Sequence, residues 1–182
     1  WTVATKLQGK ELSYNNLVDL EAARSIIAEF ADASNDPAAT IIKHNNPCGS
    51  AMGSTLLEAY EKAFNADSTS AFGGIVALNR AIDAPTANAL TKTFLECVVA
   101  PGCEPEAQEI LQAKGKVRVL ILPDLISGAK ETVKAIAGGF LVQAADDIVA
   151  DPNEWKLVTE KKPTSEELAE LVFAWKICKH VK

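Results

Sequence analysis

Residues 38–44 read AATIIKH, a short apolar run that ends in a lysine and a histidine. A run of this length and composition predicts a buried strand. Three more apolar runs follow it along the chain, GGIVALN (73–79), CVVAP (97–101) and KVRVLILP (116–123). These four segments are the candidate strands of a single sheet.

Helical patterns lie between and before these runs, over 19–30, 56–67, 84–95 and 105–114. The first helix is expected to begin at Asp19 and to be broken by ASNDP (33–37). Thr55 and Glu58 have the spacing of a capping box ahead of the second helix. NNPCG (45–49) predicts a turn. This alternation predicts an α/β fold with a largely parallel or mixed sheet and helices on both faces.

The pattern changes after residue 126. ISGAKE (126–131) resembles a joint, and TVKAIAGGFLVQ (132–143) predicts two short strands around a glycine pair. After polar residues 146–163, Thr164 and Glu167 are expected to open a helix over 165–182. Its apolar stripe, which needs a partner surface, consists of Leu168, Leu171, Val172, Trp175, Cys178 and Val181. The chain starts at Trp1 and stops inside this predicted helix, so we expect a fragment of a longer polypeptide.

Composition excludes several classes of protein. The net charge of −6 and the lack of a basic stripe argue against a nucleic-acid partner. No apolar run reaches membrane-spanning length, and no signal-peptide pattern is present, so we expect no membrane partner. The four cysteines form no CxxC pair, which favours reduced thiols and a cytoplasmic location.

Lys43 and His44 are the first candidates for chemistry. In open α/β sheets, ligands gather beyond the carboxyl ends of strands, and this pair leaves a predicted strand. A neutral imidazole can accept a proton, and the adjacent ammonium both disfavours the charged imidazolium and can stabilise an oxyanion. The alternative is a solvent-exposed basic strand end with a purely structural turn.

Other candidates have weaker local signals. The Gly73–Gly74 pair permits close approach of a ligand, but it also fits a tight strand entry. Glu96 could accept a hydrogen bond from a ribose or an amine, or be a solvated helix end. Cys48 is a weak candidate nucleophile, and His180 is better explained as part of a solvated basic face. The zinc deaminase pattern pairs H-x-E with P-C-x-x-C, and its ligand spacing is missing here, so no metal is expected.

At this point the motifs resemble a known family. KHNNPCG (43–49) is similar to the K-H-x-x-P-C/A-G motif of AICAR transformylase, the folate-dependent half of the bifunctional purine biosynthesis enzyme that also carries IMP cyclohydrolase. Further segments match that family in the same order: LQGKELSYNN (7–16), TSAFGGIVALNR (69–80), VVAPG (98–102), GGFLVQ (138–143) and FAWKICKHVK (173–182). The resemblance spans essentially the whole chain.

The resemblance implies a fold and an activity. The fold would be a cytidine deaminase-like three-layer α/β lobe with a mixed sheet over 1–130, followed by the truncated start of a second similar lobe over 131–182. The family transfers a formyl group from 10-formyltetrahydrofolate, its co-substrate, to the amine of AICAR and gives FAICAR, without zinc. The parent enzyme would be a homodimer and would also act as IMP cyclohydrolase.

The resemblance also implies roles for individual residues. His44 falls on the family's proton acceptor and Lys43 on the lysine that stabilises the transition state. Gly73 and Glu96 fall on positions that line or contact AICAR, and Glu96 replaces an aspartate found in some members. Residues that bind the folate stay unassigned.

Parts of the family's site are missing from this chain. An arginine–tyrosine pair would lie upstream of Trp1, and a Ser-Asn segment would follow Lys182, so the isolated chain is expected to be inactive. Two alternative functions stay open. One is a zinc deaminase-like hydrolase, and the other is a non-catalytic nucleotide-binding or oligomerisation module of the same fold.

Overall fold

The computed structural model describes residues 1–32, 36–149 and 151–182, and the predicted break at 33–37 lies partly outside them. The chain divides into two units, residues 1–126 with 180–182, and residues 127–179. The elements of the first unit are β1 (Thr5–Gln8), α1 (Tyr14–Ala28), β2 (Ala38–Lys43), β3 (Asn46–Met52), α2 (Leu56–Ala66), α3 (Ser68–Ala71), β4 (Gly74–Leu78), α4 (Ala84–Leu90), β5 (Leu95–Ala100), α5 (Pro105–Gln112) and β6 (Arg118–Ile121). Among the described residues these strands form one six-stranded sheet in the order β1-β6-β5-β4-β2-β3.

The sheet is mixed, as predicted. β4, β5 and β6 are parallel, whereas β2 runs antiparallel to both β3 and β4, and β1 runs antiparallel to β6. Two strands were not predicted from the sequence. β1 is short and half exposed, and β3 carries Pro47. Because β3 lies at the edge of the sheet, its proline is tolerated there.

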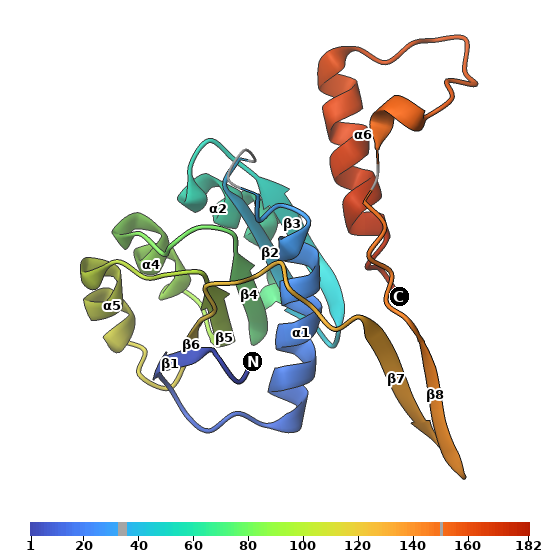
Figure 1. Cartoon of the computed structure of the whole chain (residues 1–182). Helices are drawn as coiled ribbons and strands as arrows, with labels where there is room; N and C mark the ends of the chain where they lie inside the picture. The colour runs from blue at the N-terminus through green and yellow to red at the C-terminus, as the bar shows by residue number, and fades with distance from the viewer. Residues whose placement is uncertain (33–35, 150) are drawn as a thin grey trace. The chain divides into compact units, whose positions relative to one another are not determined.

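Helices cover both faces of this sheet, as predicted (Figure 1). α1 packs against β2, β4 and β5 on one face. Buried residues of α2, α4 and α5 form a continuous apolar cluster with Ile41, Val76, Val98 and Val119 on the other face. Strand residues alternate between these two layers because successive side chains point to opposite faces.

The boundaries of two predicted helices were wrong. α1 begins at Tyr14, ahead of the predicted start, because Ser13 and Asn16 form a reciprocal capping box, and Asp19 lies inside the helix. A helix over 84–95 was also predicted, but α4 ends at Leu90. Residues 95 and 96 already belong to β5, so Glu96 is a strand residue and not a helix end.

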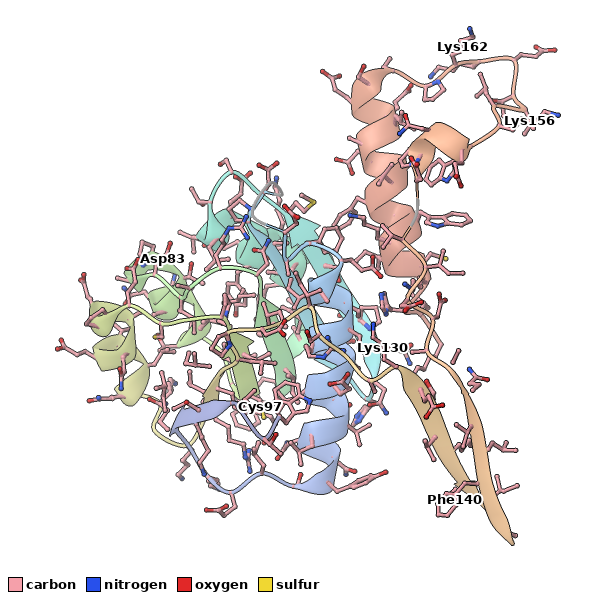
Figure 2. All side chains as sticks on the ribbon, viewed as in Figure 1. Asp83, Cys97, Lys130, Phe140, Lys156 and Lys162 are labelled. Atoms are coloured by element: carbon pink, nitrogen blue, oxygen red, sulfur yellow. The ribbon has the colours of Figure 1, made fainter. Side chains whose placement is uncertain are left out.

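The second unit contains the hairpin of β7 (Glu131–Ile136) and β8 (Gly139–Ala144), the short 3-10 helix η1 (Pro152–Glu154) and helix α6 (Ser165–Cys178). The predicted capping box of Thr164 and Glu167 is confirmed. Many apolar side chains here are exposed, including Phe140 on the hairpin at 71% (Figure 2) and Trp175 on α6 at 61%. The apolar stripe of α6 therefore lacks a full cover among the described residues.

The predicted boundary between lobes, at 130/131, lies four residues after the division between the units, and the assignment of 131–182 to a second lobe stays a prediction. Helix α6 ends at Cys178 and is therefore shorter than the predicted 165–182, and residues 180–182 group with the first unit. Among the described residues, no helix is both long and apolar enough to cross a membrane.

Asn79 ties the start of β2 to the segment before it. Its buried side chain accepts a hydrogen bond from the Ala38 N–H at 2.7 Å and donates to the carbonyls of Phe30 at 2.7 Å and Asp36 at 2.9 Å. A single amide therefore forms hydrogen bonds with three backbone groups. Asn79 directly follows β4, so its amide lies at the opposite end of this strand from Gly74.

We expect Asn79→Ala to lower the free energy of unfolding by about 2–3 kcal/mol, because buried backbone groups lose their partners. Urea denaturation followed by circular dichroism measures this loss. Asn88→Ala is the matched control, since its amide is exposed and makes one bond to the Ala84 carbonyl at 3.0 Å. The control is expected to change stability by less than about 0.5 kcal/mol. Equal effects of the two variants would contradict the role given to Asn79.

Candidate active site

The two candidate catalytic residues lie at a sharp turn between β2 and β3. Lys43 and Asn46 face each other across the hairpin, so His44 and Asn45 alone form the loop. Both have left-handed backbone conformations, with φ of 53° for His44 and 65° for Asn45. A two-residue loop needs φ > 0 at both positions to match the twist of its strands, as in a type I′ turn. The turn was predicted over 45–49, but it includes His44 itself, and residues 46–49 belong to β3.

This conformation has an energetic cost. A left-handed backbone costs a residue with a Cβ about 1–2 kcal/mol, although histidine and asparagine adopt it more often than most residues. Such residues persist only where the surrounding structure holds them. Here the pairing of Lys43 with Asn46 fixes the two ends of the turn. Within the turn, the Asn45 N–H donates to Asp19 Oδ1 of α1 at 2.8 Å.

Lys43 points toward the start of β4. Its ammonium donates to the carbonyl oxygens of Phe72 at 2.8 Å and Gly73 at 3.2 Å. His44 is exposed and makes no hydrogen bond to any other described residue. The two side chains therefore differ: the lysine is held in place by backbone carbonyls, and the imidazole is free to meet a ligand.

Gly73 lies directly beside Lys43. It has φ +68°, and a Cβ built at this position would lie 3.0 Å from Lys43 Nζ and 3.3 Å from Phe94 Cε1. Its N–H donates to the Phe94 carbonyl at 2.8 Å, which joins the start of β4 to the start of β5. The rings of Phe72 and Phe94 contact each other with centroids 5.4 Å apart. Sequence reasoning noted Gly73 but missed Phe72, whose only signal was its place before the glycine pair.

Glu96 lies near the start of β5 and is paired with a cation. Arg118 of β6 donates to its carboxylate at 2.7 Å and also to the Glu11 carbonyl at 2.8 Å. The Arg118 side chain is only 12% exposed, whereas Glu96 is 39% exposed. A ligand can therefore reach the carboxylate while the arginine supports it from the protein side. Arg118 was also missed from the sequence, since one arginine in a strand is no motif.

The charges near Glu96 act on a buried thiol. Burial, the largest cause, raises the pKa of Cys97 to about 12; Glu96 and Asp19 raise it further, and Arg118 opposes the rise. Cys97 thus stays a neutral thiol. Burial also raises the pKa of Cys48, so a thiolate nucleophile at that position is disfavoured.

Strand direction explains how these residues meet. β2 is antiparallel to β4, so Lys43, at the carboxyl end of β2, lies beside Gly73 and Gly74, at the amino end of β4. Gly74 in turn pairs with Leu95 of β5. The sequence indicated that Lys43 leaves a strand and that Gly73 enters one. The antiparallel pairing of β2 and β4 brings these two opposite ends together.

The remaining histidine lies elsewhere. His180 Nε2 is 3.1 Å from Oε1 of Glu29, the residue that follows α1, and its side chain is only 16% exposed, so the expectation of a solvated face was wrong. Among the described residues, no group of three or more histidine, cysteine or acidic side chains is arranged to hold a metal ion.

The sequence of the whole chain is similar to that of one protein family. The family model described as "AICARFT/IMPCHase bienzyme" matches residues 1–182. The chain is 77% identical to the bifunctional purine biosynthesis protein PurH of Nostoc punctiforme and 70% identical to that of Synechocystis sp., in both cases over all of this chain. It spans 35% of the length of each of these relatives. A solved structure of Acinetobacter baumannii RibD matches 59% of this chain and 34% of that chain at 16% identity and a TM-score of 0.39.

We expect Gly73→Ala to lower the free energy of unfolding by about 1–2 kcal/mol, because alanine pays the left-handed penalty. The added methyl group also crowds Lys43 Nζ, so the ammonium should lose its bonds to the two carbonyls. Urea denaturation measures the first effect, and a crystal structure of the variant shows the second.

Gly115→Ala is the matched control for this variant. Gly115 is not left-handed, and a Cβ there would lie an ordinary 3.5 Å from the Gln112 carbonyl oxygen. The control is expected to be neutral or slightly stabilising. Equal destabilisation by both variants would contradict the role of backbone conformation at Gly73.

Proposed function

The chain belongs to the AICARFT/IMPCHase bienzyme family, and from this premise we propose that it forms part of an enzyme that transfers a formyl group from 10-formyltetrahydrofolate to AICAR. The product, FAICAR, would be a precursor in purine biosynthesis, and the parent protein would also carry the IMP cyclohydrolase. The names of the relatives, bifunctional purine biosynthesis proteins, support this proposal.

One observation carries the proposal for the site: the left-handed turn exposes the imidazole of His44, and the ammonium of the preceding residue, Lys43, is already fixed. His44 is exposed at the tip of the hairpin, and Lys43 is held at the Phe72 and Gly73 carbonyls. Formyl transfer to a weakly nucleophilic amine needs both a base and a cation near the formyl oxygen.

The proposed chemistry follows from these two groups. The AICAR amine is conjugated with its carboxamide-bearing ring and is therefore a poor nucleophile. His44 accepts a proton from the AICAR amine while the amine nitrogen forms its bond to the formyl carbon. Lys43 stabilises the negative charge that develops on the formyl oxygen. When the bond between the formyl carbon and N10 of the folate breaks, His44 returns the proton to N10. Tetrahydrofolate and FAICAR result, and no proton is gained or lost overall.

Gly73 and Glu96 are proposed to bind AICAR. The absence of a side chain at Gly73 lets the ligand approach the backbone beside Lys43. The half-exposed Glu96 carboxylate can accept a hydrogen bond from a ribose hydroxyl or an amine, while its contact with Arg118 keeps it oriented. The folate-binding residues stay unassigned, and the proposed chemistry uses no metal.

The architecture is proposed to follow the family as well. Residues 1–130 would form a cytidine deaminase-like lobe, which the mixed sheet and its two helical layers support. Residues 131–182 would begin a second, similar lobe. A cytoplasmic homodimer is proposed for the parent enzyme.

The role of His44 is tested in the full-length enzyme with His44→Ala at saturating AICAR and folate. We expect formyl transfer to fall roughly a hundredfold or more, as for loss of a general base. The cyclohydrolase activity of the same preparation should be unchanged and reports correct folding.

The chain has two histidines, so His180→Ala is a matched control and should transfer formyl within a few-fold of the unmodified enzyme. A His44→Ala rate within a few-fold of the unmodified enzyme would mean that this histidine is structural. That outcome would favour a non-catalytic, nucleotide-binding role for this part of the chain.

We expect the 182-residue chain alone to show no formyl transfer, because it spans 35% of the length of the relatives that carry the purine biosynthesis name. The assay is product formation with purified chain, with the full-length enzyme as the positive control. Turnover by the chain alone would contradict this map of the site, in which further residues come from outside the chain.

A further inference from the structure

We infer that Asp19 of α1 is a positioning residue for the formyl transfer proposed above, because its carboxylate fixes the His44–Asn45 turn by accepting the Asn45 backbone N–H. This inference rests on the proposed function. It adds a residue whose position in the sequence, 25 residues before His44, gave no sign of such a role.

The turn needs a support outside the hairpin. His44 and Asn45 both have left-handed backbones, which residues with a Cβ keep only under constraint. The hairpin pairing constrains Lys43 and Asn46, the residues on either side. The Asn45 N–H points instead to Asp19 Oδ1, at 2.8 Å. This bond joins the middle of the turn to a different element.

Helix α1, which carries Asp19, is anchored by its buried residues. The residue after Asp19, Leu20, and Ala23 one turn further along α1 are fully buried. Because α1 packs against β2, β4 and β5, the position of the Asp19 carboxylate is fixed relative to the same strands that carry Lys43, Gly73 and Glu96. The carboxylate therefore links the turn to the rest of the site.

Helix α1 itself does not require an aspartate at position 19. The N-terminus of α1 is capped by Ser13 and Asn16, so Asp19 is not needed as a cap. Among the described residues, Asp19 has no ion-pair partner, and the Asn45 N–H is its one hydrogen-bond donor. Its specific contact is with the turn that carries the proposed base.

Loss of this contact should affect catalysis more than binding. With the acceptor gone, the turn keeps its left-handed conformation but loses its hydrogen bond to α1, so His44 can shift relative to Lys43. A displacement of about 1 Å can cost roughly a hundredfold in rate. Lys43, Gly73 and Glu96 keep their own contacts, so AICAR binding should change little.

The experiment uses the full-length enzyme with Asp19→Ala and Asp19→Asn. Asp19→Ala is expected to lower kcat for formyl transfer roughly tenfold to a hundredfold, with the KM for AICAR within about threefold. Asp19→Asn should recover most of this loss, because the amide oxygen can still accept the Asn45 N–H. Cyclohydrolase activity of each preparation serves as the measure of folding.

Asp83→Ala is the matched control (Figure 2). Asp83 also accepts a backbone N–H, that of Thr86 at 2.9 Å, but it caps α4 after the opposite end of β4. It should lower the thermal stability to a similar degree and leave kcat within about twofold. A purely structural role for Asp19 predicts equal effects of the two alanine variants.

Three results would overturn the inference. They are an Asp19→Ala kcat within about threefold of the unmodified enzyme, an equal loss in Asp83→Ala, or an Asp19→Asn variant as slow as Asp19→Ala, which would assign the effect to charge. His44→Ala in the same assay separates this inference from the proposed function. A slow His44→Ala with a normal Asp19→Ala refutes the inference alone, whereas an active His44→Ala refutes the proposed base itself.

Discussion

The antiparallel pairing of β2 with β4 is the constraint on which the candidate site depends. If all the central strands ran parallel, the carboxyl end of β2 would lie far from the amino ends of its neighbours. Because β2 is reversed, Lys43 lies beside Gly73, and the register continues from Gly74 to Leu95. The hairpin to β3 then has only two residues in which to turn, so His44 must take part in the turn itself.

Most of the charged groups around the site have a partner on the protein. Lys43 is held by two carbonyls and Glu96 by Arg118, and Asp19 accepts a hydrogen bond from the turn. His44 differs, since it is exposed and has no hydrogen bond among the described residues. This contrast is the arrangement that the proposed acid–base role of His44 requires, because fixed neighbours would set the geometry and the free imidazole would exchange the proton. Burial keeps the nearby Cys97 thiol neutral by raising its pKa, so it adds no competing nucleophile.

Sequence patterns predicted most of the strands and helices, but they predicted the first and last residues of these elements less well. The apolar runs gave four of the six strands of the main sheet, and the alternation gave the helical layers. The missed strands are the short, half-exposed β1 and the proline-bearing β3, both at sheet edges where burial leaves little signal. The start of α1 was missed because its capping box ends in asparagine instead of the usual glutamate or glutamine.

The sequence by itself determined the α/β class, the family resemblance and the candidate residues Lys43, His44, Gly73 and Glu96, because these are carried by local composition and by motifs of adjacent residues. Only the tertiary structure decided that Gly73 lies beside Lys43, that Arg118 pairs with Glu96, and that Asp19 accepts the Asn45 N–H of the turn. The physical reason is strand direction and register. These are set by which faces can be buried together across the whole sheet, and no short stretch of sequence encodes them.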